Sequence, residues 1–307
     1  MTDNILEEFA NSNLKSLVLC ADSIEEIKKI PSNSIDLILS DIPYGIGLDD
    51  WDVLHDNSNS AYGGKSPAQE KAGAVFKKRG KPINGWSEAD KKIPYEYQEW
   101  CRTWSNEWLR VLKPGGSAFI FAGRRFAHRC IASLEDVGFN FRDLLGWTKT
   151  KAVHRAQRLS IVYDRRGDMD SSKYWNGWRI GNLKPTFEPI IWVFKPYKLT
   201  IADNVLEHRL GAYNHEALEK YFGNADNIFE CGMEKGEAGF HPAQKPLRLM
   251  KALIELVTIP GQIVLDPFAG SGTSALAALD LGRKSISIER NKEYCEIIKN
   301  RTKKHTI

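Results

Sequence analysis

The chain has 307 residues, 42% of them hydrophobic, and a net charge of +4, which is enough apolar material for a sizeable core. No run of 18 apolar residues occurs, and the acidic start MTDNILEEFA does not resemble a secretory signal, so a membrane span and export are not expected. Five scattered cysteines without a Cys-x-x-Cys pair argue against a disulfide framework and a zinc ribbon. We therefore expect a globular cytoplasmic protein with reduced cysteines and no metal.

The positive charge is concentrated in two segments. Residues 65–92 carry a net charge of +5 and residues 149–168 a net charge of +4, so the rest of the chain is net acidic. Gathering like charges costs free energy unless a partner neutralises them, and this pattern indicates contact with a polyanion. Two solvated surface loops are the alternative.

The first predicted elements lead to an acidic residue at the end of a strand. Residues 16–20 are typical of a strand, and Asp22 precedes an amphipathic helix over 24–30. The apolar run 34–40 predicts a buried strand that ends at Asp41. Residues 53–93 are polar, rich in Gly, Ser and Lys, and too long for an ordinary connection. We expect them to form a lid or ligand-binding loop.

Strands and helices then alternate along the chain. The predicted elements are a helix over 95–112, a strand over 117–122, a helix over 125–137, and strands over 140–149 and 188–195. Residues 150–187 form a basic and aromatic insert that contains Trp175 and Trp178, for which packing under the loop is the favoured interpretation. Residues 198–240 are polar and show no firm pattern.

The C-terminal third continues the alternation. Pro246 opens a helix over 246–258, and a Pro-Gly turn leads into a strand over 263–265. Alternating strands and helices imply a mostly parallel, doubly wound sheet that is covered on both faces.

A glycine-rich turn lies in IVLDPFAGSGTSALAALDLGRKSISIE, residues 263–289. The first strand ends at Asp266, a helix begins at Thr273, and a second strand ends at Glu289. Gly270 and Gly272 leave room for a ligand at the helix N-terminus, and Glu289 is placed to accept hydrogen bonds from ribose hydroxyls. The sequence therefore predicts a nucleoside site.

Three interpretations of the turn remain to be weighed. No Lys-Ser/Thr follows the glycines, so a nucleotide triphosphatase loop does not fit. The pattern Gly270-x-Gly272-x-x-Ala275 with Glu289 fits a dinucleotide fingerprint loosely, which leaves an NAD-dependent dehydrogenase open. A purely structural turn is the third interpretation. The Asp266-Pro-Phe prefix is unusual for a dehydrogenase and favours another nucleoside ligand.

Four motifs together resemble one enzyme family. DPFAGSGT with Glu289 is similar to the S-adenosylmethionine site of methyltransferases, and DIPY at 41–44 resembles the Asp-Pro-Pro-Tyr motif of DNA amino-methyltransferases. HPAQKP at 241–246 resembles their cofactor-side motif, and the motif order is that of their permuted beta group. The resemblance covers roughly 16–52, 94–149, 188–197 and 241–300.

The resemblance implies one catalytic domain over 1–307 with a Rossmann-like methyltransferase fold and circularly permuted motif order. Residues 53–93 and 150–187 are then inserts, and 198–240 is the expected target-recognition region. In the family's sheet the strand ending at Asp266 lies beside the strand ending at Asp41, where strand order reverses and ligands bind. Neighbouring strands lie roughly 5 Å apart, so these two distant segments are expected to share one cleft.

The expected cofactor is S-adenosyl-L-methionine. The resemblance assigns Asp22 to the adenine of the cofactor and Glu289 to its ribose, and Lys245 is expected to pair with its carboxylate. The remaining predicted cofactor residues form the turn itself: Asp266, Pro267, Phe268, Ala269, Gly270, Ser271, Gly272 and Thr273.

The predicted catalytic residues are Asp41, Ile42, Pro43 and Tyr44. The exocyclic nitrogen of a nucleobase is a poor nucleophile because its lone pair is delocalised, and acceptors at the Asp41 carboxylate and the Ile42 carbonyl would turn that lone pair toward the methyl donor. Tyr44 would stack on a base flipped out of the duplex. Ile42 stands where the family has proline, but its carbonyl survives the change, so retained activity is expected.

Asp at position 41 favours N6 of adenine, since family members that act on N4 of cytosine usually begin this motif with serine. The cytosine N4 enzyme is the nearest alternative. An NAD-dependent dehydrogenase and a non-catalytic DNA-binding protein are alternatives from other classes, and cofactor titration would separate them.

The expected partner is DNA, double-stranded, bound at its phosphates by basic residues. A homodimer, a cognate restriction endonuclease or a phage context, and a bacterial or phage origin are further expectations that come from the family alone. The candidate DNA-binding residues are Lys77, Lys78, Arg79, Lys81, Arg124, Arg125, Arg155, Arg158, Arg165 and Arg166.

Overall fold

The computed structural model describes residues 9, 12–44, 88–152, 156–237, 239–240 and 243–305. Within these residues the centre of the fold is an eight-stranded sheet with the order β1-β10-β9-β2-β3-β7-β4-β8. Only β7 runs antiparallel to its neighbours in this sheet, so the predicted mostly parallel sheet is confirmed. The strands are β1 (Ser16–Cys20), β2 (Ile35–Asp41), β3 (Leu112–Phe121), β4 (Asn140–Thr148), β7 (Phe187–Phe194), β8 (Ile228–Glu230), β9 (Ile263–Asp266) and β10 (Lys284–Glu289).

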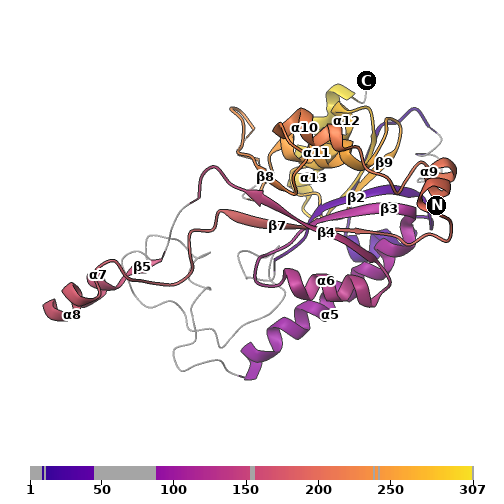
Figure 1. The fold of residues 1–307 in the computed structure, drawn as a ribbon. Helices are drawn as coiled ribbons and strands as arrows, with labels where there is room; N and C mark the ends of the chain where they lie inside the picture. Colours follow the sequence, from indigo (N-terminus) through magenta and orange to yellow (C-terminus); the bar gives the residue numbers. More distant parts are fainter. Residues whose placement is uncertain are drawn as a thin grey trace.

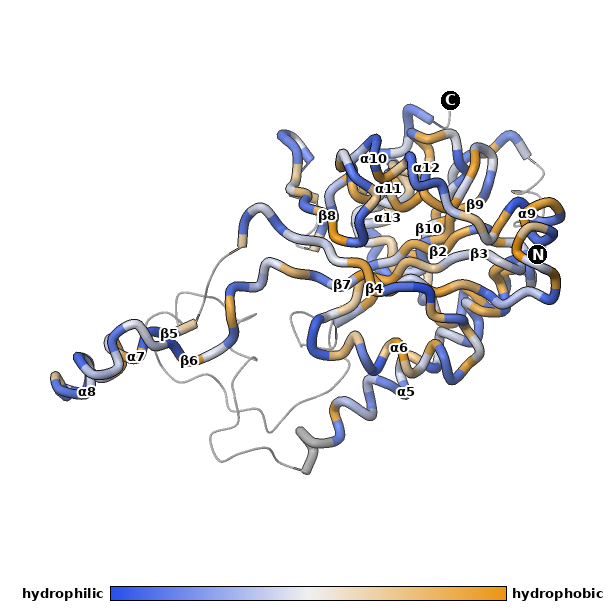
Figure 2. Tube along the Cα trace, viewed as in Figure 1, coloured by the Kyte–Doolittle hydropathy of each residue, from blue (hydrophilic) through white to orange (hydrophobic). Residues whose placement is uncertain are grey.

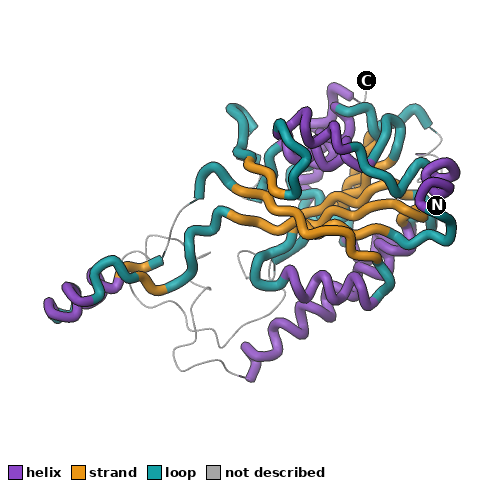
Figure 3. The backbone as a smooth tube through the Cα atoms, viewed as in Figure 1, coloured by secondary structure: helices purple, strands orange, loops and turns teal. Residues whose placement is uncertain are grey.

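Helices cover both faces of the sheet (Figures 1 and 3). α5 (Glu88–Val111) and α6 (Ala127–Asp136) lie on one face, and α10 (His215–Phe222), α11 (Leu247–Val257) and α12 (Thr273–Asp280) lie on the other. The remaining helices of the main body are α2 (Ser23–Glu26), η1 (Ile27–Lys29), α9 (Ile201–His208), α13 (Lys292–Thr302) and η2 (Lys303–His305).

The central strands are apolar on both sides because each side meets a helical layer. In β2, Ile38 belongs to the core cluster that includes Trp104 and Trp108 of α5, whereas Leu37 and Leu39 belong to the cluster built on α11. Figure 2 shows the hydrophobic segments gathered in the sheet and its adjoining helices. Burial on both faces explains why β2 is a continuous apolar run rather than an alternating one.

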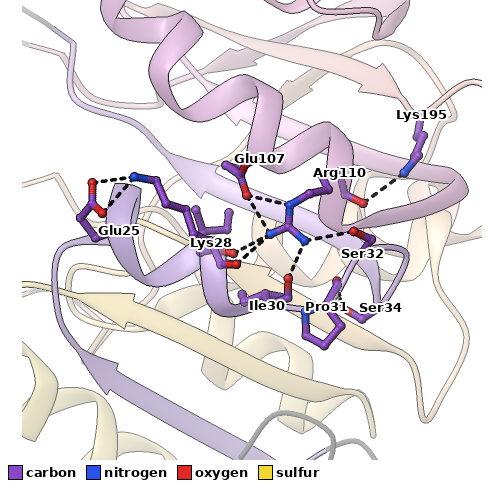
Figure 4. Close-up of polar contacts among 10 residues, drawn as sticks. Glu25, Lys28, Ile30, Pro31, Ser32, Ser34, Glu107, Arg110 and Lys195 are labelled. Atoms are coloured by element: carbon purple, nitrogen blue, oxygen red, sulfur yellow. Dashed lines mark hydrogen bonds and ion pairs between the residues drawn. The ribbon is translucent and has the colours of Figure 1, made fainter. Parts of the chain in front are cut away.

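Hydrogen bonds of Arg110 and Asp36 fix the start of β2. Arg110, at the end of α5, donates hydrogen bonds to the carbonyl oxygens of Ile30 at 2.7 Å and Ile27 at 3.0 Å and pairs with Glu107 (Figure 4). Asp36 accepts from Lys113 Nζ at 2.7 Å and from the backbone N–H of Ile263 at 2.8 Å, which links β2 to β3 and to β9. These contacts fix the strand whose other end carries Asp41.

Residues 198–240, for which the sequence showed no firm pattern, contain α9, α10 and β8. Thr200 caps α9, Arg209 ends it in the left-handed region, and Gly223 ends α10 in the same way. α9 lies at the amino ends of the strands, where Asn204 Nδ2 donates to the carbonyl oxygen of Pro114 at 3.1 Å. The elements are short, which explains why periodicity alone did not reveal them.

Residues 156–186, called the arm below, project away from the sheet (Figure 1). The arm contains β5 (Gln157–Arg158), α7 (Leu159–Asp164), α8 (Met169–Tyr174) and β6 (Arg179–Ile180), and β5 pairs with β6 in an antiparallel ribbon. It connects the end of β4 to the start of β7, so it leaves the sheet at the carboxyl ends of the parallel strands.

Candidate active site

The structure brings the two distant motifs into one place. β2 and β9 are neighbours in the sheet, with Leu37 opposite Val264 and Ile38 opposite Leu265. Both strands end at the same edge, where Ser40 Oγ donates a hydrogen bond to Asp266 Oδ1 at 2.7 Å. Residues 226 and 227 positions apart in the chain therefore meet at the switch point of the sheet, where ligands of such folds bind.

A cavity of about 310 Å³ opens at this edge. Acidic groups line part of it, and the ring of Trp100 lines another part. The volume is in the range of small-molecule sites. Of the residues predicted from the sequence, the lining contains Asp22, Asp41, Pro43, Lys245, Asp266, Pro267, Phe268, Ala269, Gly270, Ser271, Thr273 and Glu289. Ser23, Ile24, Trp100, Asn291 and Tyr294 also line it and were not predicted.

The glycine turn is held by two carboxylates. Asp266 accepts from Ser40 Oγ, from Ser274 Oγ and from the Phe268 N–H at 3.1 Å. Glu289 accepts from the N–H groups of Gly270 at 2.9 Å and Asn291 at 2.8 Å. Burial raises the pKa of Asp266 to about 6, although its hydroxyl partners oppose that rise. The two acids therefore shape the turn as well as lining the cavity.

Gly272 has to be glycine for two reasons. Its φ of +76° lies in the left-handed region, and a Cβ there would lie 2.8 Å from Ile298 Cγ1 of α13. The turn can thus pack closely against α13 and still begin α12 at Thr273.

Three charged residues surround Asp41, and two of them, Lys245 and Glu188, are buried. Lys245 Nζ lies 2.5 Å from Asp41 Oδ2 and 3.2 Å from Glu188 Oε1. Glu188 also pairs with Lys149, and the Tyr44 hydroxyl donates to Glu188. The sequence prediction paired Lys245 with a cofactor carboxylate, whereas in the structure its ammonium is held by two carboxylates of the protein.

Burial and pairing set the protonation of this cluster. Burial raises the pKa of Asp41, and the charge of Lys245 only partly offsets this effect. Burial also raises the pKa of Glu188, but the charges of Lys245 and Lys149 lower it by more, to about 2. Burial lowers the pKa of Lys245, yet Asp41 and Glu188 raise it above its usual value. Glu188 and Lys245 are therefore firmly charged, and Asp41 is the group whose charge depends on its partners.

The second oxygen of the Asp41 carboxylate lacks a hydrogen-bond donor in the described part of the chain. Asp41 Oδ1 is buried and has no hydrogen-bond partner in the described part of the chain. A buried carboxylate oxygen without a donor costs free energy, which a donor from a ligand would offset. The atom belongs to a residue that lines the cavity. The arrangement can accept one N–H from a ligand while Lys245 holds the other oxygen.

The DIPY backbone is held from two sides. Tyr97 of α5 donates its hydroxyl to the carbonyl oxygen of Pro43 at 3.2 Å. The Tyr44 side chain lies against Gly123, where a Cβ would come within 3.0 Å of Tyr44 Cβ. Ile42 is buried in the core cluster that also contains Trp104 and Trp108 of α5. Lys245 Nζ lies 5.5 Å from the centre of the Tyr44 ring.

Sequence reasoning missed Glu188, although a signal was present. FEPIIWVF is an apolar strand with one acid, and a charge inside a buried strand demands a partner. Lys149 was counted only as part of a basic segment. Asp22 was predicted to touch a ligand; its carboxylate caps α2 by accepting from the Ile24 N–H at 2.9 Å, and it also lines the cavity.

The candidate DNA-binding residues divide into three groups. Arg124 and Arg125 follow β3 at the carboxyl edge, and the Arg125 guanidinium lies 4.6 Å from the centre of the Phe126 ring. Arg158, Arg165 and Arg166 are exposed on the arm. The predicted contacts at Lys77, Lys78, Arg79, Lys81 and Arg155 lie outside the described residues, as does most of the insert 53–93.

The described residues contain neither a metal-binding cluster nor a membrane-spanning helix. No group of three or more His, Cys, Asp or Glu side chains there could hold a metal ion. Among the described helices, none is long and apolar enough to cross a membrane.

A family model and curated relatives match this chain. The model, described as DNA methylase, matches residues 35–300. The Type II methyltransferase M.HindIII of Haemophilus influenzae is 57% identical over 288 residues, which cover 92% of this chain and 93% of that protein. The Type II methyltransferase M.HpaI of Haemophilus parainfluenzae is 27% identical over 292 residues, which cover 92% of this chain and 73% of that protein.

Solved structures share the fold. The PvuII DNA methyltransferase, described as cytosine-N4-specific, aligns with a TM-score of 0.61 at 17% identity over 94% of this chain and 86% of that one. The M1.HpyAVI–SAM complex aligns with a TM-score of 0.52 at 21% identity over 93% of this chain and 98% of that one.

Proposed function

The chain belongs to the DNA methylase family, and we propose that it transfers a methyl group from S-adenosyl-L-methionine to the exocyclic N6 of adenine in DNA. The observation that carries the proposal is the buried, unpartnered Oδ1 of Asp41 beside a cavity that the glycine turn also lines. A dehydrogenase has no use for an ion-paired carboxylate in that position. A DNA-binding protein without catalysis has no use for the cavity.

The residues around the cavity fit the proposed cofactor. Gly270 lines the cavity without a side chain, which suits close approach of a ligand to the backbone at the start of α12. The acids of Asp22 and Glu289 can accept hydrogen bonds from amino and hydroxyl groups of a nucleoside, and the ring of Trp100 offers an apolar wall. S-adenosyl-L-methionine would supply the reactive methyl group on its sulfonium.

Asp41 would act on the target amino group as a hydrogen-bond acceptor. With Oδ2 held by Lys245, Oδ1 would accept one N–H of the base, and the Ile42 carbonyl is the candidate acceptor for the other. Two acceptors rotate the nitrogen lone pair out of conjugation and make it nucleophilic. The proton leaves after transfer, when the methylated amino group has become strongly acidic.

Lys245 and Glu188 are positioning residues in this proposal. Lys245 favours the ionised form of Asp41 and opposes the rise in pKa that burial causes. Glu188 holds both the Lys245 ammonium and the Tyr44 hydroxyl. We assign Lys245 to Asp41 rather than to a cofactor carboxylate because its ammonium is already bound by two carboxylates. Tyr44 would stack on the flipped base while Glu188 fixes its ring.

Adenine is proposed because the motif begins with Asp41, the residue typical of adenine enzymes in this family. The test is to incubate the protein with DNA and labelled cofactor, digest the DNA and separate the nucleosides. Label in N6-methyladenine supports the proposal. Label in N4-methylcytosine would move the enzyme to the cytosine class, and no label in DNA would refute the function.

The Type II relatives support a wider setting for the protein. We propose that it acts in the bacterial cytoplasm beside a cognate endonuclease, because the relatives are named as Type II methyltransferases. A homodimer remains a prediction from the family. Expression of the enzyme should protect host DNA from a Type II endonuclease of matching specificity.

A further inference from the structure

We propose that the arm, residues 156–186, is the element that grips duplex DNA beside the active site and contributes to target recognition, in place of α9 and α10 of the expected region 198–240. This inference rests on the proposed function, since it assumes that the substrate is DNA. It is carried by where the arm leaves the sheet, by its charge, and by its exposed aromatic side chains.

The root of the arm is part of the catalytic cluster. Lys149 follows the last residue of β4, Glu188 is the second residue of β7, and the two side chains are ion-paired. Glu188 in turn contacts Lys245, which holds Asp41. A duplex that delivers a base to Asp41 must therefore pass close to the base of the arm.

The first part of region 198–240 lies on the opposite edge of the molecule. Asn204 of α9 contacts Pro114 at the amino end of β3, and Gln262, just before β9, donates to the Arg209 carbonyl oxygen at 3.2 Å. Figure 1 shows α9 at one end of the sheet and the arm at the other. α10 packs against α11, where Lys220 and Tyr221 both donate hydrogen bonds to Glu255, so these side chains are already engaged within the protein.

The arm has little core of its own. Ser172 is the single buried residue among its members, and several large apolar side chains are exposed. Hydrogen bonds within the arm, such as Leu159 N–H to the Trp178 carbonyl oxygen at 3.0 Å, hold its shape. A projecting element of this size with exposed apolar groups is typical of a binding surface.

The positive charge of the arm favours a polyanionic partner such as DNA. The arm carries six cations and three acids, and no acid of the described residues forms an ion pair with any of the six. Arg158 and Arg179 stand directly opposite each other in the β5–β6 ribbon and are both exposed. Like charges in facing positions cost free energy, which phosphate groups would offset. The six cations are Arg158, Arg165, Arg166, Lys173, Arg179 and Lys184.

Aromatic rings add a second kind of contact. Trp175 packs edge to face between Tyr174, at 5.1 Å, and Trp178, at 5.3 Å. Tyr174 is 76% exposed. Trp178 is 61% exposed, which contradicts for this residue the favoured expectation of packing under the loop, whereas Trp175 is half-buried. Exposed rings beside arginines are suited to stacking on bases or wedging between them.

The test compares two double variants in the full-length protein. Arg158→Gln/Arg179→Gln removes the facing pair, and Lys198→Gln/Arg209→Gln removes two exposed cations near α9 at the opposite edge. The dissociation constant for a fluorescently labelled duplex of mixed sequence is measured by anisotropy across a range of salt concentrations. Each phosphate contact contributes about 0.9 to the slope of log K against log salt, so the arm variant should lower the slope by about 2 and the other variant should not.

Trp178→Ala tests the stacking contact, with Trp178→Phe as the control that keeps a ring. The alanine variant should bind the duplex at least about fivefold more weakly, and the phenylalanine variant should recover most of that loss. Cofactor titration and circular dichroism verify that the variants fold.

Three results would overturn the inference. One is an unchanged salt slope in the arm variant. Another is a lowered slope in the Lys198/Arg209 variant instead. The third is sedimentation showing that Trp178→Ala turns a dimer into a monomer while DNA affinity stays the same, because the arm would then contact a second copy. If the wild-type protein binds DNA through the arm but transfers no methyl, the proposed function fails and the inference stands.

Discussion

Replacing Lys245 with methionine tests how the buried cluster controls Asp41. The change keeps the length of the side chain and removes the ammonium that lies 2.5 Å from Asp41 and 3.2 Å from Glu188. Glu188 keeps Lys149 as a partner, whereas Asp41 loses its only cation among the described residues. We therefore expect Asp41 to take up a proton, because its burial already raises its pKa.

The magnitude follows from the geometry. At an effective dielectric constant of about 20, Coulomb's law gives roughly 7 kcal/mol for charges 2.5 Å apart, part of which offsets desolvation. Removing one partner of a buried pair costs about 3–5 kcal/mol, which equals about 2–4 pKa units. The acid limb of the rate should therefore move up by at least about 2 pH units. At pH values below the acid limbs of both proteins, methyl transfer by Lys245→Met should be about 10²-fold to about 10⁴-fold slower than by the wild type.

The assay is single-turnover methyl transfer measured across pH, so that product release does not mask the chemical step. Lys149→Met is the matched control, because that lysine contacts Glu188 and not Asp41; its acid limb should move much less. Lys245→Arg should restore much of the rate. The reasoning is wrong if Lys245→Met leaves the acid limb in place but weakens cofactor binding, since the lysine would then serve the cofactor carboxylate.

Three further predictions concern the turn and the motif. Burial raises the pKa of Asp266 from 3.8 to about 6, so the folded state binds the extra proton and wild-type stability should fall as pH rises through this window. Measured by urea unfolding relative to Asp266→Asn, the loss between pH 4 and pH 7 should be about 2 kcal/mol, and equal differences at both pH values would contradict it. Gly272→Ala should lower the free energy of unfolding by about 1–3 kcal/mol, because its φ is +76° and the new Cβ meets Ile298. The control is Gly261→Ala, where φ is also positive but no heavy atom lies within 4 Å of the new Cβ. Ile42→Pro should keep the methyl-transfer rate within about threefold, because the carbonyl acceptor is retained; complete loss of transfer would count against a role for that carbonyl.

The region around the glycine turn could be predicted closely from the sequence. The strand end at Asp266, the helix start at Thr273 and the strand end at Glu289 agree with the structure. Strong apolar runs and glycines with defined conformations act over short distances, so a local pattern contains the needed information. The neighbouring positions of Asp41 and Asp266 came from the family resemblance rather than from any local pattern.

The charged cluster could not be found in this way. Glu188, Lys149 and Lys245 meet because β7 inserts antiparallel between β3 and β4, and no sequence period encodes that order. The Lys-Pro-Gly-Gly segment shows a similar limit. A strand was expected from Ser117, but β3 begins at Leu112, because a shift in register between Ile35 and Leu37 accommodates the extra residues. Pairing between strands distant in the sequence determined both the charged cluster and the start of β3.

The most direct test of the account is Asp41→Ala, with cofactor binding and methyl transfer measured on the same preparation. The variant should bind S-adenosyl-L-methionine nearly as well as the wild type and transfer no methyl to DNA, because one of the two acceptors on the amino group is gone. Methylation at a rate close to that of the wild type would contradict the account.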